Sequence, residues 1–67
     1  MIEIRLNGEA VRLADLTNLR ELVSERVERV EGVAVARNDE VVPRSEWADA
    51  IVVDGDRIEI LVAAQGG

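Results

Sequence analysis

The first thirteen residues constrain the fold more than any other stretch of the chain. Apolar and charged residues alternate over residues 2–6, which is the period of a half-buried strand. Asn7-Gly8 follows at once, and this pair favours the positive φ angles that a two-residue hairpin turn needs. Residues 9–13 have the pattern of a returning strand. The opening therefore predicts a β-hairpin with one apolar face, and that face needs another element to cover it.

A helix is the predicted cover. Thr17 or Asn18 can cap it, and Asn18 with Glu21 three residues later makes an approximate capping box. Gly32 supplies a left-handed stop, so the helix is expected to run until just before this glycine. The residues that recur at helical spacing along one apolar stripe are Leu19, Leu22, Val23, Val27 and Val30.

The middle of the chain predicts short strands. Residues 33–37 form a mostly apolar run of strand length, and Asn38-Asp39 marks a turn before a short return strand over residues 40–42. Residues 43–47 have the pattern of a cap followed by one helical turn, with Trp47 expected to lie over an edge of the core.

The final strand fixes the architecture. Residues 54–56, Asp-Gly-Asp, predict a turn, and residues 57–62 alternate with Ile58, Ile60 and Val62 on one face. Because this apolar face demands burial, the strand must sit within the sheet. The resulting order, ββαββ, predicts an α+β fold in which one main helix packs across one face of a mixed β-sheet. Residues 1–62 are expected to form the domain and residues 63–67 a flexible tail.

The composition excludes most enzyme chemistry. The 67 residues include no cysteine and no histidine, so disulfides, thiolate metal sites and imidazole acid–base catalysis are unavailable. All eight basic residues are arginine, which leaves no lysine for a Schiff base. Asp54 and Asp56 could suggest paired carboxylates, but turn chemistry explains them better. We therefore predict no catalytic residue and no metal ligand.

The charge balance narrows the class of partner. Fourteen acidic residues against eight basic ones give a net charge of −6. This balance argues against nucleic acid and anionic membranes, and it fits steering toward a basic partner surface. No targeting segment or membrane span is visible, so a soluble cytoplasmic protein is expected.

The distinctive functional group is the carboxylate at Gly67. The last five residues end in Gln65-Gly66-Gly67, and glycine has the narrowest cross-section of any residue. Five residues can extend roughly 16–18 Å from the body that holds them. Such a tail can thread a narrow channel into another protein's active site, although a frayed chain end is the simpler alternative.

Four groups of residues carry a resemblance to a known family. They are Asn7-Gly8, Asn38 with Val42-Pro43-Arg44-Ser45 and Trp47, Gly55-Asp56-Arg57-Ile58-Glu59-Ile60, and Gln65-Gly66-Gly67. Together they resemble the ThiS family, the ubiquitin-like β-grasp sulfur carriers of thiamine biosynthesis. The similarity runs from Met1 to Gly67, and the run at residues 42–47 is its most specific part. Ala64 departs from the larger apolar residue expected at its position.

The resemblance implies a specific chemistry at the tail. An E1-like adenylyltransferase (ThiF-like) would use ATP to convert the Gly67 carboxylate into an acyl-adenylate, and a sulfur donor protein would convert that to a thiocarboxylate. A thiazole synthase (ThiG-like) would then accept the sulfur. Gln65 and Gly66 would thread the partner's active site. The chain itself would bind no cofactor, because the ATP is used by the partner enzyme.

Three alternatives stay open at this point. The chain could be a sulfur carrier for molybdopterin or cysteine synthesis, although the molybdopterin type usually has a proline-rich approach to the tail, which residues 62–65 lack. It could be a ubiquitin-like modifier of other proteins, or an interaction module that happens to end in glycine. For any of these, the sheet face bearing Glu59 and Leu61 is the expected docking surface, because it adjoins the tail.

Overall fold

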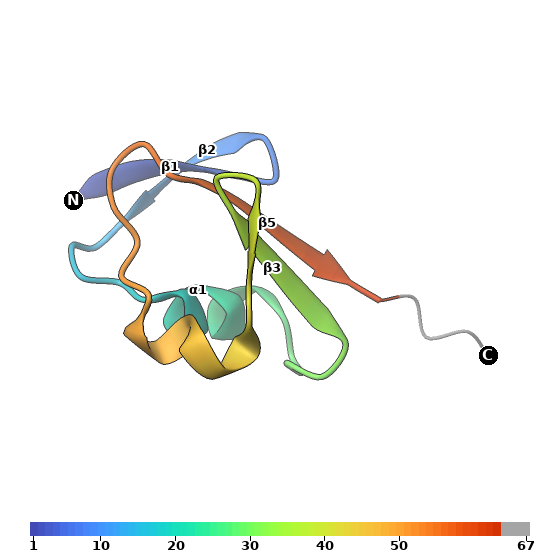
Figure 1. Cartoon of the computed structure of the whole chain (residues 1–67). Coiled ribbons are helices and arrows are strands. Elements are labelled where there is room, and N and C mark those ends of the chain that lie inside the picture. The colour runs from blue at the N-terminus through green and yellow to red at the C-terminus, as the bar shows by residue number, and fades with distance from the viewer. Residues whose placement is uncertain (64–67) are drawn as a thin grey trace.

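A computed structural model describes residues 1–63 and contains a five-stranded mixed sheet with α1 lying across one of its faces (Figure 1). The spatial order of the strands is β2-β1-β5-β3-β4. With the short β4 counted, the order of elements along the chain is ββαβββ. The elements are β1 (Ile2–Leu6), β2 (Glu9–Leu13), α1 (Leu19–Arg26), β3 (Val33–Arg37), β4 (Glu40–Val42), the 3₁₀ helix η1 (Arg44–Asp49) and β5 (Arg57–Val62).

The last strand is the central one. β5 pairs in parallel with β1, with Leu6 opposite Ile58, and antiparallel with β3, with Val35 opposite Ile60. The two hairpins, β1–β2 and β3–β4, therefore lie on opposite sides of β5 and are joined through it. This confirms the prediction that the apolar face of residues 57–62 places the strand within the sheet.

The first hairpin has the predicted turn. Asn7 and Gly8 adopt φ angles of 50° and 86°, the left-handed values that Asn-Gly accommodates at low cost. Ile4 and Leu6 are buried on the inner face, which α1 covers. The second hairpin turns in the same way at Asn38 and Asp39, with φ angles of 50° and 72°.

The helix begins where predicted and ends earlier. The Asn18 side chain accepts a hydrogen bond from the Glu21 amide, and the Glu21 carboxylate accepts one from the Asn18 amide, which completes the capping box. The helix then stops at Arg26, because Val27 is extended with φ −133° and ψ 149°. The expectation of a helix up to Gly32 is therefore wrong. Val27 and Val30 still pack against the core, from a non-helical segment.

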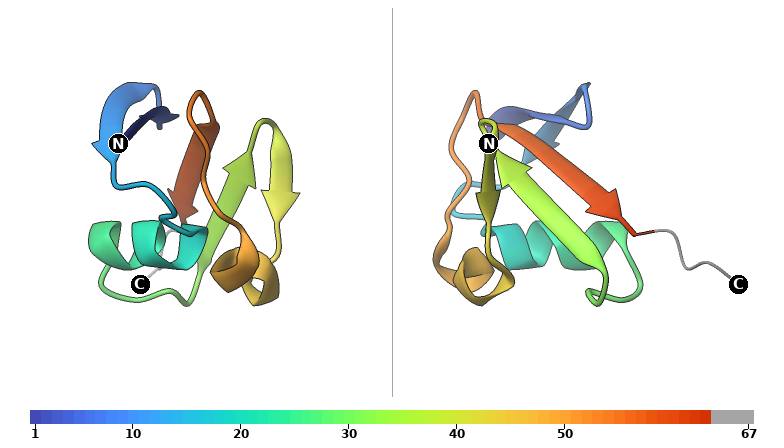
Figure 2. Two further views of the ribbon diagram at one scale, coloured as in Figure 1. Left: turned by 90° about the vertical axis from the view of Figure 1, so that its left-hand side faces the viewer. Right: turned by 45° about the vertical axis from the view of Figure 1, so that its right-hand side comes forward.

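Trp47 is a core residue, which corrects the prediction that it lies over an edge. It sits on η1, beside α1 and under the same face of the sheet (Figure 2), and its side chain is 1% exposed. The indole Nε1 donates a hydrogen bond of 2.9 Å to the Val42 carbonyl. A buried indole needs such an acceptor, and the end of β4 supplies it.

The described residues contain no helix long and apolar enough to cross a membrane.

The core consists of aliphatic side chains packed around the single tryptophan, with α1 and the inner faces of β1, β3 and β5 as its main contributors. Its fully buried members are Trp47, Ile4, Leu19, Leu22, Ile58, Val23, Val35 and Val52.

Candidate functional site

The candidate site is the end of β5, where the chain leaves the body. The three tail residues predicted to act, Gln65, Gly66 and Gly67, lie outside the described residues. What the structure does describe is the base from which they extend, up to Ala63 (Figure 1). Two sets of hydrogen bonds hold this base in place.

Asn7 holds β5 from the β1 side. Its side-chain Oδ1 accepts a hydrogen bond of 2.9 Å from the Ile60 amide, and its Nδ2 donates one of 3.2 Å to the Ile60 carbonyl. The amide side chain thereby acts as one more residue of β1, beyond the point where the parallel pairing ends at Leu6. Sequence reasoning assigned Asn7 to the hairpin turn alone, because its second partner lies 53 positions away along the chain.

The segment between α1 and β3 holds β5 from the other side. The Ala63 amide donates a hydrogen bond of 2.8 Å to the Gly32 carbonyl. This bond continues the β3–β5 register, in which Val33 stands opposite Val62. Gly32 adopts a φ of 76°, and glycine takes that left-handed value without a Cβ penalty. The strand pairing therefore extends one residue past Val62, to the last described residue.

The outer face of the sheet beside this base is partly apolar. Leu61 is 64% exposed and stands opposite Ala34, which is also exposed. Glu59 is exposed and stands opposite Ala36, which in turn pairs with the 75% exposed Val41. The structure thus brings Glu59 and Leu61 together on one open face, as predicted, and adds Val41, which the sequence analysis did not single out.

Val62 departs from its prediction. It lies on the inner face with Ile58 and Ile60, yet it is 60% exposed while they are buried. The early end of α1 explains this, because no helical turn covers the end of β5. An open groove of about 320 Å³ lies there, with Val62 and Val27 among its lining residues.

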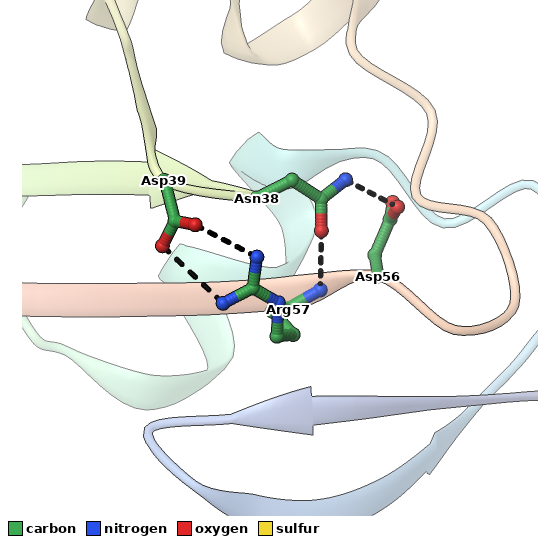
Figure 3. Close-up of polar contacts among 4 residues, drawn as sticks. All are labelled: Asn38, Asp39, Asp56 and Arg57. Carbon is green, nitrogen blue, oxygen red and sulfur yellow. Dashed lines mark hydrogen bonds and ion pairs between the residues drawn. The ribbon is translucent and has the colours of Figure 1, made fainter.

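A polar cluster fastens the start of β5 to the turn between β3 and β4 (Figure 3). Asp56 is only 4% exposed, and its Oδ2 lies 2.9 Å from an Arg37 guanidinium nitrogen and accepts a hydrogen bond from the Val53 amide. Its Oδ1 accepts a hydrogen bond of 3.1 Å from Asn38, whose own Oδ1 accepts one from the Arg57 amide. Asp56 thus makes one bond within its own turn, back to Val53 rather than forward as in an Asx-turn, together with longer-range bonds.

On the solvent side of this cluster, Arg57 makes a two-pronged ion pair with Asp39, at 2.8 and 3.3 Å (Figure 3). Hydrogen bonding to Arg57, reinforced by its positive charge, holds the pKa of the Asp39 carboxyl below its usual value. The same contact raises the pKa of Arg57. Both groups are exposed, so this contact is a surface salt bridge between the start of β5 and the turn between β3 and β4.

The acidic side chains of the described residues are the candidate ligands for a metal site. Among these residues, no three His, Cys, Asp or Glu side chains come together as a group that could hold a metal ion. The buried carboxylate of Asp56 has its oxygens occupied by Arg37, Asn38 and the Val53 amide. The central strand of the sheet, β5, ends at Val62, next to the last described residue, Ala63.

Comparison with known proteins gives consistent results. The model of the ThiS family matches residues 4–67. The chain is 36% identical over 66 residues to the sulfur carrier protein ThiS of Escherichia coli strain K12, covering 98% of this chain and 100% of that protein. It is also 35% identical over 66 residues to a thiazole synthase of Paramagnetospirillum magneticum, of which it spans 20%.

Solved structures agree with the sequence relatives. The crystal structure of a thiamine biosynthesis protein (ThiS) from Geobacter metallireducens superposes with a TM-score of 0.83 at 33% identity, covering 98% of this chain and all of that one. The solution structure of a thiamine biosynthesis protein from the same organism gives a TM-score of 0.81 at 35% identity, with 98% and 88% coverage. The β-grasp fold expected from the sequence is thereby confirmed.

Proposed function

The chain belongs to the ThiS family, and we propose that the carboxylate of Gly67 is the atom group on which it carries sulfur. The protein is a sulfur carrier of thiamine biosynthesis, a small protein that is not itself a catalyst. The assignment to thiamine biosynthesis is favoured over a sulfur carrier for molybdopterin or cysteine synthesis. The observation that carries the proposal is the whole-length match to a sulfur carrier, in a chain whose central strand runs directly to the Gly-Gly end.

The chemistry starts from an unreactive group. A carboxylate resists nucleophiles because its leaving group would be an oxide, so it must first be activated. An E1-like adenylyltransferase joins the Gly67 carboxylate oxygen to the α-phosphorus of ATP and releases pyrophosphate. A donor protein then releases sulfur as hydrosulfide, which attacks the acyl carbon, displaces AMP and gives up its proton. The product is a terminal thiocarboxylate, formed without any cysteine in the carrier.

A thiazole synthase is the acceptor of this sulfur. The support is the relative named thiazole synthase, in which a segment similar to this whole chain makes up a fifth of a longer protein. A carrier-like segment and a synthase within one polypeptide keep the two at high effective concentration.

The body contributes docking and alignment. Leu61 and Glu59 lie on the open face next to the tail, so a partner that receives the tail contacts this face at the same time. Burial of an exposed leucine side chain contributes roughly 1.5–3 kcal/mol. The net charge of −6 steers the carrier toward a basic rim around the partner's channel.

Intact-mass measurement tests the proposal. The full chain is incubated with a purified E1-like adenylyltransferase, ATP and sulfide as the sulfur source. The chain should gain the mass difference between sulfur and oxygen, and a chain lacking Gly67 should gain nothing. An isopeptide adduct on another protein would support a modifier instead, and an unchanged mass for the full chain would overturn the proposal.

The docking face has its own test. Leu61→Arg should reduce adenylation by at least about tenfold, mainly by raising KM, because it removes a buried contact and places a cation against a basic rim. Ala10→Arg is the matched control, since Ala10 is exposed on the same face but on β2, two strands from β5. Equal rates for both variants would show that the partner docks elsewhere.

A further inference from the structure

We propose that the hydrogen bond from the Ala63 amide to the Gly32 carbonyl acts as a clamp that sets how far the tail reaches from the body. This inference rests on the proposed function, because reach matters only if the chain end has to arrive at a partner's active site. It assigns a positioning role to the segment between α1 and β3, in addition to the packing of Val27 and Val30 against the core.

The clamp is the last bond of an alternating series. In an antiparallel pair, residues that exchange hydrogen bonds alternate with residues that do not. The Asn38 backbone amide donates to the Arg57 carbonyl, and the Ala63 amide donates to the Gly32 carbonyl. The backbone amide and carbonyl groups of the odd-numbered residues of β5 therefore point toward β3. Ile60, an even-numbered residue, bonds instead to Asn7 on the β1 side. The bonded position next before Ala63 is therefore Leu61, opposite Ala34.

Nothing else in the described chain secures residue 62. Val62 stands opposite Val33 at a position that is not hydrogen-bonded, and its side chain is 60% exposed beside the open groove. The Asn7 side chain reaches only Ile60. Losing the Ala63 bond thus frees two residues rather than one.

The difference in reach is large for so short a tail. Four residues, 64–67, follow Ala63, and fully extended they span at most roughly 13–14 Å. Without the clamp the last bonded residue of β5 would be Leu61, and the six residues that follow it, 62–67, span at most roughly 20–22 Å when fully extended. A longer and looser segment places its end at any one point less often, because effective concentration falls with linker length once the span is met.

The segment that carries the clamp is shaped for it. Gly32 has a left-handed φ of 76°. The Val33 amide donates a hydrogen bond of 3.2 Å to the Val30 carbonyl, which closes a tight turn. Val27 and Val30 fix the same segment to the core. The Gly32 carbonyl is thereby held toward β5 by packing, and its position does not depend on the tail.

The test uses a substitution whose effect should change sign with tail length. Ala63→Pro removes the amide hydrogen and with it the clamp. In the full-length chain, ATP–pyrophosphate exchange by a purified ThiF-like adenylyltransferase should slow by about tenfold, seen as a higher KM, because newly freed residues must be ordered on docking. Ala63→Ser keeps the amide hydrogen and, as the conservative variant, should restore most of the rate.

The same substitution should help a shortened tail. A chain lacking Ala64 has lost one residue of reach, and misplacing the carboxylate by a few ångströms should slow exchange by about a hundredfold or more. Adding Ala63→Pro to the shortened chain should recover about tenfold of that loss, since the released residues restore the missing length. If Ala63→Pro slows both chains equally, or affects neither, the clamp proposal is overturned.

A second measurement is independent of the partner enzyme. Amide hydrogen exchange should be at least about tenfold slower at Ala63 than the intrinsic rate, because the clamp must open first. Exchange at the intrinsic rate would overturn the clamp even if adenylation is fast. A full-length chain that supports no pyrophosphate exchange, with Ala63 protected, would instead overturn the proposed function and with it the role given to the clamp.

Discussion

At the scale of single residues, Asp56 and Asn7 connect parts of the chain that are remote in sequence. Asp56 joins the end of the 54–56 turn to Arg37 and Asn38, so the register of β3 against β5 is fixed by charge as well as by the ladder. Asn7 does the equivalent on the β1 side through Ile60. Both residues hold the strand that carries the tail.

Asp56→Ala should lower the free energy of unfolding by about 2–3 kcal/mol, because it removes a buried carboxylate on which the partly buried Arg37 guanidinium and the Val53 amide depend for their bonds. Urea unfolding monitored by the fluorescence of Trp47 measures this. Asp54→Ala is the matched control. Asp54 is exposed and accepts a single hydrogen bond from the Glu3 amide, so its loss should cost less than about 1 kcal/mol. If the two substitutions lowered the free energy of unfolding equally, the burial of Asp56 would not explain its contribution to stability.

Asp39 gives a prediction about pH. Contact with Arg57 lowers the pKa of the Asp39 carboxyl in the folded chain, so the folded state is favoured when the group is ionised. The contribution is present above the unfolded pKa of about 3.9 and disappears as the pH falls through the lower folded value. The urea midpoint should therefore be slightly higher for the unsubstituted chain than for Asp39→Asn at pH 7, and the difference should fade in acid. A difference that grows on acidification would contradict this.

The residue-scale contacts were only partly predictable. Asn7-Gly8 and the Asp56 turn are local signals, because the backbone angles they favour depend on neighbours in sequence. The second partner of each residue is set by strand pairing over 53 positions for Asn7 and 18 for Asp56. No local pattern encodes those distances. The tail residues 65–67, which carry the proposed chemistry, could be found only because they stand at the chain end and match a family pattern.

At the scale of elements, the start of α1 was predictable and its end was not. Asn18 and Glu21 cap the helix through bonds three residues apart, which the sequence displays directly. Val27 and Val30 keep a helical spacing in the sequence, but they pack against the core from a segment that is not helical. A helix of eight residues is about 12 Å long. The remaining residues up to Gly32 are then available to build the turn that meets Ala63.

Asn18→Ala should destabilise the protein by about 1 kcal/mol, because the Glu21 amide loses its acceptor and the reciprocal bond of the capping box loses its geometry. Chemical denaturation measures the change. Arg20→Ala, on the exposed side of the same first turn, should stay within about 0.5 kcal/mol. A larger effect at Arg20 than at Asn18 would mean that the cap does not limit the stability of α1.

At the scale of the whole molecule, Met1 and Ala63, the first and last described residues, lie at opposite ends of the sheet. β1 and β5 are parallel neighbours, so Met1 lies near the start of β5 while Ala63 lies beyond its end (Figure 1). The amino group of Met1 pairs with Asp15 at 3.1 Å, but both groups are exposed and such a pair contributes little. One end of the molecule is therefore available for attachment without touching the other.

A folded domain joined to Met1 should leave thiocarboxylate formation within about twofold of the unmodified chain, since Met1 lies near the start of β5, whereas Leu61 and Ala63 lie at its other end. One extra alanine after Gly67 should abolish it, because the carboxylate then belongs to a different residue. Mass spectrometry of both proteins after reaction with the adenylyltransferase decides the matter. Loss of activity on adding the domain at Met1 would place a partner contact on that side.

The central place of β5 also determines at which point in translation the five-stranded sheet can form. The ribosome makes this strand last, at roughly 5–20 residues per second, and until then the two hairpins have no strand between them to join into a sheet. A nascent chain halted before residue 57 lacks both the completed fold and the Gly-Gly end. Translation that halts before β5 therefore yields incomplete chains rather than folded, tailless competitors for the adenylyltransferase.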